Sequence, residues 1–174
     1  MEHKKLKTFP ILLTERLILR QLSDSNVQEI FLLRSDSLIN KYLDRQPSET
    51  VADALQFIDW IKNNSLSYWG IAQKGEEKLI GTICLFNVSE ELGNCEIGYE
   101  LLADYQGKGI MREAAKKVIA YAHQTLGLKT IDAFTHKDNQ GSTNLLKELK
   151  FMRMDSVDAD NSNLILFRLQ RSSV

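Results

Sequence analysis

The stretch Tyr105-Gln106-Gly107-Lys108-Gly109-Ile110-Met111-Arg112-Glu113-Ala114 joins a strand-like run to a helical one. Cys95 to Leu102, before it, is rich in β-forming residues, and from Met111 apolar residues recur at helical spacing until Gly127, a typical helix stop. Glycines let a backbone turn tightly and expose successive N–H groups, and a helix N-terminus adds its positive dipole end. The order strand, glycine loop and helix therefore predicts a cradle for a pyrophosphate.

The charges and spacing of this loop narrow the choice of ligand. Lys108 and Arg112 would add positive charge beside the two glycines. The spacing GxxxxGK(S/T) of a Walker loop is absent, and the dinucleotide pattern GxGxxG fails because Arg112 stands three residues after Gly109. A Gly-Lys-Gly sequence is also compatible with a plain surface turn. If the loop binds phosphate, the ligand is neither a Walker-bound nucleotide nor a dinucleotide held by GxGxxG.

The residues upstream alternate between apolar runs and turn-forming residues. Ser23-Asp24-Ser25 separates a first strand from a first helix, and Pro47-Ser48-Glu49 introduces a second helix. Lys74-Gly75 and Leu92-Gly93-Asn94 separate three β-rich runs, as in an antiparallel meander. The predicted elements are a strand at 17–19, a helix around Ile30 and Leu33, a helix ending near 63–64, and strands at 68–72, 79–86 and 95–102.

Downstream of the 111–126 helix, the pattern predicts a strand at 130–135, a helix at 139–149 and, after a polar turn, a last strand at 163–169. This order of elements, a meander followed by helix, strand, helix and strand, indicates an α/β protein with a mixed sheet. No repeat, low-complexity tract or linker interrupts the sequence, so residues 1–174 are expected to form a single domain.

Composition argues against several classes of function. The formal net charge is −1 and no basic block stands out, so nucleic acid is not an expected partner. Residues 1–7 are charged, and no window approaches the roughly 18 apolar residues of a membrane span, so neither secretion nor a membrane is expected. Cys84 and Cys95 are expected to be buried, reduced thiols in a cytoplasmic protein. The histidines form no HxxxH or HExxH pair, so no metal is expected.

The glycine loop resembles motif A of the GCN5-related N-acetyltransferases (GNAT), Gln/Arg-x-x-Gly-x-Gly/Ala. Gln106 and Gly109 match it, and Met111 replaces the final small residue, as in the branch similar to the RimJ/RimL protein-terminus acetyltransferases. Three further stretches agree in order: Thr14-Glu15-Arg16-Leu17-Ile18-Leu19-Arg20, Glu96-Ile97-Gly98-Tyr99 and Asn139-Gln140-Gly141-Ser142.

The resemblance implies the GNAT fold and its cosubstrate, acetyl-CoA. That fold has a mixed, mostly antiparallel central sheet of six to seven strands with helices on both faces, and the cosubstrate lies between splayed strands four and five. The residues implied to bind it are Tyr99, Glu100 and Leu101 through their backbone, the loop residues Gln106, Gly107, Lys108, Gly109, Ile110, Met111 and Arg112, and Asn139 and Ser142.

Acetyl transfer needs an uncharged amine and a proton for the departing thiolate. By resemblance Ser142 is the proton donor, although a polar residue in a first helical turn is the simpler interpretation; relatives that use tyrosine carry it where Leu146 stands. Asn139 is also a plausible helix N-cap. Glu96 is the candidate base and shares a strand face with Glu100, but strand carboxylates commonly face solvent, so a water-relayed base is the alternative.

The acceptor can be narrowed by the cost of deprotonating it. At pH 7 this cost is roughly 4.6 kcal/mol for a lysine and roughly 1.1 kcal/mol for an α-amine. A site without an obvious base therefore favours an α-amine, such as a protein N-terminus. The alternatives are a small amine (polyamine, aminoglycoside or amino acid) and a catalytically silent CoA-binding regulatory domain. The sequence leaves monomer and homodimer open.

Two surface hypotheses concern the acceptor. The acidic segment Asp155-Ser156-Val157-Asp158-Ala159-Asp160 could attract a cation, but a solvated turn is the simpler interpretation. Tyr68, Trp69 and Trp60 could line an acceptor pocket, but their spacing favours core packing.

Overall fold

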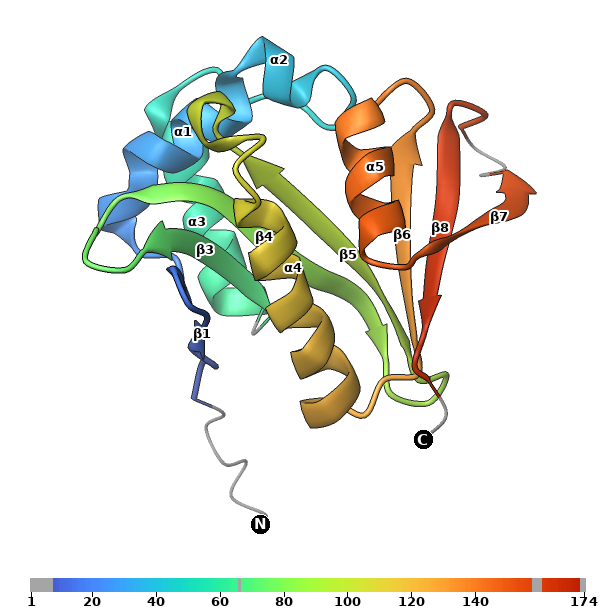
Figure 1. The fold of residues 1–174 in the computed structure, drawn as a ribbon. Helices are drawn as coiled ribbons and strands as arrows, with labels where there is room; N and C mark the ends of the chain where they lie inside the picture. The colour runs from blue at the N-terminus through green and yellow to red at the C-terminus, as the bar shows by residue number, and fades with distance from the viewer. Residues whose placement is uncertain (1–7, 66, 158–160, 173–174) are drawn as a thin grey trace.

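A single curved sheet runs through the molecule, with helices on both of its faces (Figure 1). The computed structural model describes residues 8–65, 67–157 and 161–172. Within these residues the sheet has eight strands in the order β1-β2-β3-β4-β5-β6-β8-β7. Their bounds are Leu12–Leu13 (β1), Leu17–Arg20 (β2), Tyr68–Gln73 (β3), Leu79–Ser89 (β4), Asn94–Leu101 (β5), Thr130–His136 (β6), Met152–Val157 (β7) and Leu164–Gln170 (β8).

Strands β5 and β6, the fourth and fifth of the predicted set, form the one parallel pair of this sheet as far as the structure describes it. Their pairing covers only Asn94 to Glu96 against Thr130 to Asp132. Beyond it the strands diverge, and Figure 1 shows them as a V that opens toward the helices α2 (Ser37–Asn40) and α5 (Gln140–Glu148). The predicted splay of these two strands is therefore confirmed.

The expected six to seven strands were too few. Strand β1 has two residues, too short for an alternating pattern, yet it pairs with β2. Strand β7 begins at Met152 and lies at the sheet edge, paired only with β8 among the described strands. Its polar residues were interpreted as a turn because an edge strand buries little and so lacks a strong apolar pattern.

The helices divide between the two faces and enclose two apolar cores. Helices α1 and α3 pack over Leu22, Ala72 and Leu79 on one face, while α4 and α5 pack on the other face against β2 to β6 and β8. This is the predicted arrangement of a mixed sheet between helices. The helix bounds are Val27–Ser35 (α1), Ser37–Asn40 (α2), Val51–Asn64 (α3), Ile110–Ala120 (α4) and Gln140–Glu148 (α5), and α4 continues as a π-helix over Tyr121–Thr125.

Local sequence explains where the helices begin and end. Thr50 and Asp53 form a reciprocal capping box at the start of α3. Gly109, at φ 73°, starts α4, and Gly127, at φ 70°, follows its π-helical extension, as the sequence predicted. Lys150 follows α5 with φ 69°, a left-handed conformation that costs a non-glycine residue about 1 kcal/mol.

Three predictions about individual side chains have different outcomes. Trp69 is fully buried, which confirms core packing, but Trp60 is 60% exposed on α3, so core packing was wrong there. Cys95 is buried and Cys84 half-buried, and both are free thiols. Of the acidic segment, Asp155 lies in β7, whereas Asp158 and Asp160 fall outside the described residues. None of the helices in the described ranges is long and apolar enough to cross a membrane.

Candidate active site

A cleft of about 610 Å³ lies where β5 ends and the glycine loop begins. Four segments form its walls: the end of β5, the loop with the first turn of α4, helix α5, and α2 with the residues that follow it. Eleven of the twelve predicted cofactor-binding residues line it: Tyr99, Glu100, Leu101, Gln106, Gly107, Gly109, Ile110, Met111, Arg112, Asn139 and Ser142.

The glycine loop has the backbone geometry that an anion cradle requires. Gly107 and Gly109 have φ 72° and 73°, a left-handed conformation that side chains disfavour. The first backbone bond of α4 runs from Glu113 N–H to Gly109 O at 3.1 Å, so the N–H groups of residues 110–112 have no partner within the helix. A Cβ on Gly107 would meet nothing within 4 Å, which leaves the loop open on that side. These features fit a pyrophosphate.

Side chains from the N-terminal segment hold this loop in place. Glu113, in the first turn of α4, accepts hydrogen bonds from Thr14 Oγ1 (2.6 Å), from the Arg16 backbone N–H (2.8 Å) and from Arg16 Nε (2.6 Å). Arg16 Nη1 also donates to the carbonyl oxygen of Lys108 at 3.2 Å. These bonds lower the pKa of the Glu113 carboxyl, although its burial opposes them. These bonds join the residues just before β2 to the start of α4, and we call them the loop brace.

The other loop side chains have separate positions. Gln106 Nε2 donates to the carbonyl oxygen of Leu101 at 2.9 Å and so ties the loop to the end of β5. Arg112 Nη1 lies 3.4 Å from Glu148 Oε2 on α5, across the cleft. Lys108 is the one predicted cofactor-binding residue outside the cleft lining, and its ammonium lies 5.8 Å from the Tyr105 ring centroid.

Two hydroxyl groups meet on the α5 side of the cleft. Tyr99 Oη and Ser142 Oγ are 2.8 Å apart, and Asn139 Oδ1 accepts from the Ser142 backbone N–H at 3.2 Å. Asn139 is thus the N-cap of α5, as predicted. Burial raises the pKa of Tyr99 to about 12, and the Ser142 hydrogen bond opposes this only in part. The phenol therefore carries its proton at neutral pH.

The two strand carboxylates of β5 have different surroundings. Their cross-strand partners, Phe86 for Glu96 and Thr82 for Glu100, confirm that they share a face. Glu96 accepts from Asn87 Nδ2 at 2.9 Å and, among the described residues, does not belong to the cleft lining. Glu100 lines the cleft, but its carboxylate is buried and forms an ion pair with Arg45.

Comparison with known proteins agrees with this geometry. The model of the acetyltransferase (GNAT) domain matches residues 16–152. The chain belongs to the GNAT acetyltransferase family. The N-acetyltransferase YoaA of Bacillus subtilis is 32% identical over 149 residues, covering 83% of this chain and 84% of YoaA.

Of two further relatives of this N-acetyltransferase, one shares its fold and the other shares part of its sequence. A GNAT-family acetyltransferase from Bacillus anthracis has the same fold, with a TM-score of 0.81 over 92% of this chain and 98% of that one, at 21% identity. The ribosomal protein uS5-alanine N-acetyltransferase of Escherichia coli is 33% identical over 91 residues, covering 52% of this chain and 47% of that enzyme.

Some features of the acetyltransferase's cleft had only weak signals in its sequence. The Tyr99 side chain was given no role, because only its backbone was implied to matter. Thr14 and Arg16 stand in a stretch that carried the family resemblance, but 97 residues separate Arg16 from Glu113. Arg45 stands in a polar segment with no recognisable pattern.

Proposed function

We propose that this N-acetyltransferase transfers the acetyl group of acetyl-CoA by direct attack of a primary amine, and that the amine is an α-amine such as a protein N-terminus. The observation that carries the proposal is one continuous cleft that joins the glycine cradle to the Tyr99–Ser142 pair. The glycine cradle suits a pyrophosphate, and the two hydroxyl groups can donate a proton to a departing thiolate.

The donor end would be held mainly by backbone groups. The exposed N–H groups at the start of α4 would bind the pyrophosphate, with Arg112 adding positive charge. The backbone of Tyr99 to Leu101, at the end of β5, would pair with the pantetheine arm. The bound cosubstrate supplies an activated acetyl thioester, and the residues of this chain would align it.

Ser142 would donate the proton that the departing thiolate needs. Its hydroxyl lies 2.8 Å from that of Tyr99, whose raised pKa keeps the phenol protonated and able to replace the proton that Ser142 gives up. A tyrosine thus stands beside the proposed acid, although it comes from β5 rather than from α5, where Leu146 is buried in the core. The pair would act as a short proton relay.

Deprotonation of the acceptor would occur through water. Glu96 lies away from the cleft lining and Glu100 is engaged by Arg45, so neither carboxylate offers a free oxygen for direct contact with the amine. An α-amine at pH 7 needs only about 1 kcal/mol of help, which water can supply. The similarity to an enzyme named for the alanine of ribosomal protein uS5 supports the same acceptor class.

Calorimetric titration tests the donor half of the proposal. Acetyl-CoA should bind with micromolar affinity and ATP should not bind. A screen of peptide N-termini and small amines, read by release of free CoA, then tests the acceptor half. Turnover of polyamines alone would reject the α-amine assignment, and acetyl-CoA binding without turnover of any amine would identify a catalytically silent CoA-binding domain.

A further inference from the structure

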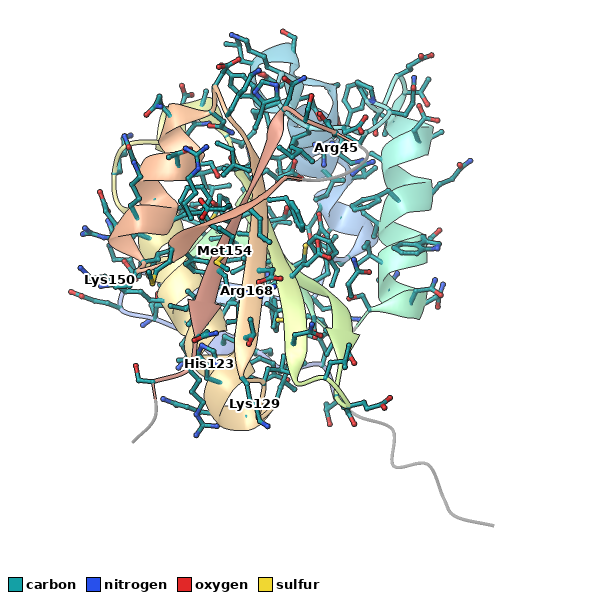
Figure 2. The ribbon with its side chains drawn as sticks, turned by 90° about the vertical axis from the view of Figure 1, so that its right-hand side faces the viewer. Arg45, His123, Lys129, Lys150, Met154 and Arg168 are labelled. Carbon is teal, nitrogen blue, oxygen red and sulfur yellow. The ribbon has the colours of Figure 1, made fainter. Side chains whose placement is uncertain are left out.

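A partly buried charged cluster lies behind the acceptor part of the cleft, formed by the buried Glu100 and the half-buried Arg34 and Arg45. Figure 2 shows Arg45 near the upper ends of the strands. Its Nη2 donates to Glu100 Oε2, and its Nε donates to Asn40 Oδ1 at 2.7 Å. Thr82 Oγ1 donates to the other carboxylate oxygen, Glu100 Oε1, at 3.2 Å. Both oxygens of Glu100 are therefore occupied by groups of this chain.

Arg34 adds a second positive charge to the cluster. Its guanidinium carbon lies 3.9 Å from the centroid of the Phe57 ring, and its Nε is buried without a hydrogen-bond partner among the described residues. Burial lowers the pKa of Arg34, and the charge of Arg45 lowers it further, whereas Glu100 raises it. Glu100 is paired with Arg45, and Arg34 lies near enough for the charges of both residues to affect its pKa, so the cluster holds two positive charges and one negative charge.

The cluster touches the cleft through its carboxylate alone. Glu100 belongs to the lining, whereas neither arginine does. Glu148 is the other acidic residue of the lining as described, and it is paired with Arg112. An ammonium group that entered the cleft would meet carboxylates that are already neutralised. The facing wall, from α2 and the residues after it, offers mainly apolar side chains: Leu38, Ile39, Tyr42 and Leu43.

We propose that Arg45 is a positioning residue that sets acceptor specificity. By neutralising Glu100 from behind the cleft wall, it makes the site prefer an amine whose neighbouring side chain is uncharged over an amine that carries a second ammonium. A second ammonium would lose its hydration without gaining a free carboxylate, and it would face the positive cluster. The inference rests on the proposed function and narrows its substrate class.

A matched pair of peptides tests the inference. Norleucyl-Ala-Ala amide and Lys-Ala-Ala amide have the same four-carbon first side chain, without and with a terminal ammonium. The readout is the ratio of their kcat/KM values for acetylation at the α-amine, with the acetylated position identified by mass spectrometry. Wild type should favour the norleucine peptide. Arg45→Met should free Glu100 and shift the ratio toward the lysine peptide by up to about fivefold, the upper end of the scale for one exposed charge pair.

Two further variants separate specificity from folding. The double variant Arg45→Met/Glu100→Gln removes both charges of the ion pair, so neither is left buried without a partner. Its kcat/KM ratio for the two peptides should return toward that of wild type. Glu100→Gln alone leaves the arginines unopposed and should shift the ratio further toward norleucine, which keeps the test decisive if Arg45→Met does not fold. Thermal melting checks each variant.

The outcomes separate a failure of this inference from a failure of the proposed function. An unchanged ratio in Arg45→Met, or the same shift in the single and double variants, would overturn the inference and leave the proposed function standing. A wild-type preference for the lysine peptide would do the same. Absence of transfer to every amine would overturn both.

Discussion

The two ends of the cleft are built from different parts of the chain. The proposed donor end comes from one short segment, Gln106 to Arg112, and would act through backbone N–H groups at one helix start. The acceptor end joins side chains from distant segments, since Arg45 and Glu100 are 55 positions apart. A backbone site depends on conformation, which short sequence patterns encode, whereas a side-chain site depends on which segments the fold brings together.

The difference also predicts how the two ends respond to mutation. At the donor end, a change that alters the backbone should abolish binding, while most side-chain changes should have moderate effects. At the acceptor end, a side-chain change should alter selectivity and leave cosubstrate affinity intact. The variants below test this contrast, beginning with the largest expected effect.

Gly109→Val should have the largest effect. A β-branched residue at φ 73° would force the loop out of its cradle conformation, and its side chain would lie against the guanidinium groups of Arg16 and Arg112. Loss of two charge-assisted hydrogen bonds would weaken acetyl-CoA binding about 1000-fold, or about 4 kcal/mol. Calorimetry measures this loss.

The matched control is Gly75→Val. Gly75 has φ 86° and nothing within 4 Å of its Cβ position, in the turn between β3 and β4. The Gly75→Val variant should lose about as much stability as Gly109→Val but keep the wild-type affinity for acetyl-CoA. Full affinity in Gly109→Val would refute the phosphate-loop assignment.

Ser142→Ala should come next, with an effect on turnover. Removal of a general acid lowers kcat by about 100-fold, whereas acetyl-CoA affinity should change little. Tyr99→Phe should lower kcat by a smaller factor, because Ser142 then exchanges its proton with water. Steady-state kinetics with a peptide acceptor measures both. A rate in Ser142→Ala equal to that of wild type would remove its role as the acid.

Arg16→Ala should have an intermediate effect confined to the donor end. Without the two Arg16 side-chain bonds of the loop brace the cradle is less ordered, so the KM for acetyl-CoA should rise about tenfold. The KM for S-acetylpantetheine, which lacks the pyrophosphate, should not change.

Arg20→Ala is the control for this variant, because Arg20 ends the strand that Arg16 precedes but bonds to Asn26 and the Glu77 carbonyl. It should leave both KM values unchanged. Equal increases for the two thioesters in Arg16→Ala would point to a general loss of structure instead of a role toward the phosphates.

Lys150→Gly lies outside both ends and should affect stability alone. The substitution releases the left-handed strain of the folded state, but glycine also raises the conformational entropy of the unfolded chain. The net effect should stabilise the protein by about 0.5 kcal/mol. This corresponds to a rise in Tm of about 1–2 °C by thermal melting. Asn87→Gly is the control: Asn87 has φ 49°, but asparagine tolerates this conformation and its side chain bonds Glu96, so no gain is expected. A decrease in Tm for Lys150→Gly would contradict the strain argument.

The smallest effect concerns pH. Burial raises the pKa of Tyr99 to about 12, so the phenol keeps its proton below that value and loses it only as pH rises through it. The kcat/KM should therefore rise while the acceptor amine deprotonates and then stay level up to about pH 10. A fall between about pH 8 and 10 that Tyr99→Phe abolished would show that the relay loses its proton earlier than burial implies.

The mixed sheet could be predicted from the sequence because each long element has a clear period, whereas the helices on both faces and the splayed strands were implied by the resemblance to the GNAT family. The sequence missed β1 and β7, which bury too few side chains to show a period. Within the cleft it predicted the loop from Gln106 to Arg112, but not the pairing of Tyr99 with Ser142. That pairing joins residues 43 positions apart through side chains that have no spacing rule.

The sequence by itself determined the conformation of the glycine loop, because two glycines between a strand and a helix encode a left-handed turn and exposed N–H groups locally. Only the tertiary structure decided the rest of the cleft. It set Arg16 against Glu113 and Arg45 behind Glu100, and it brought Tyr99 to Ser142. These contacts depend on the packing of β2, β5 and the α2 segment around one sheet, and no local pattern of residues encodes such distances.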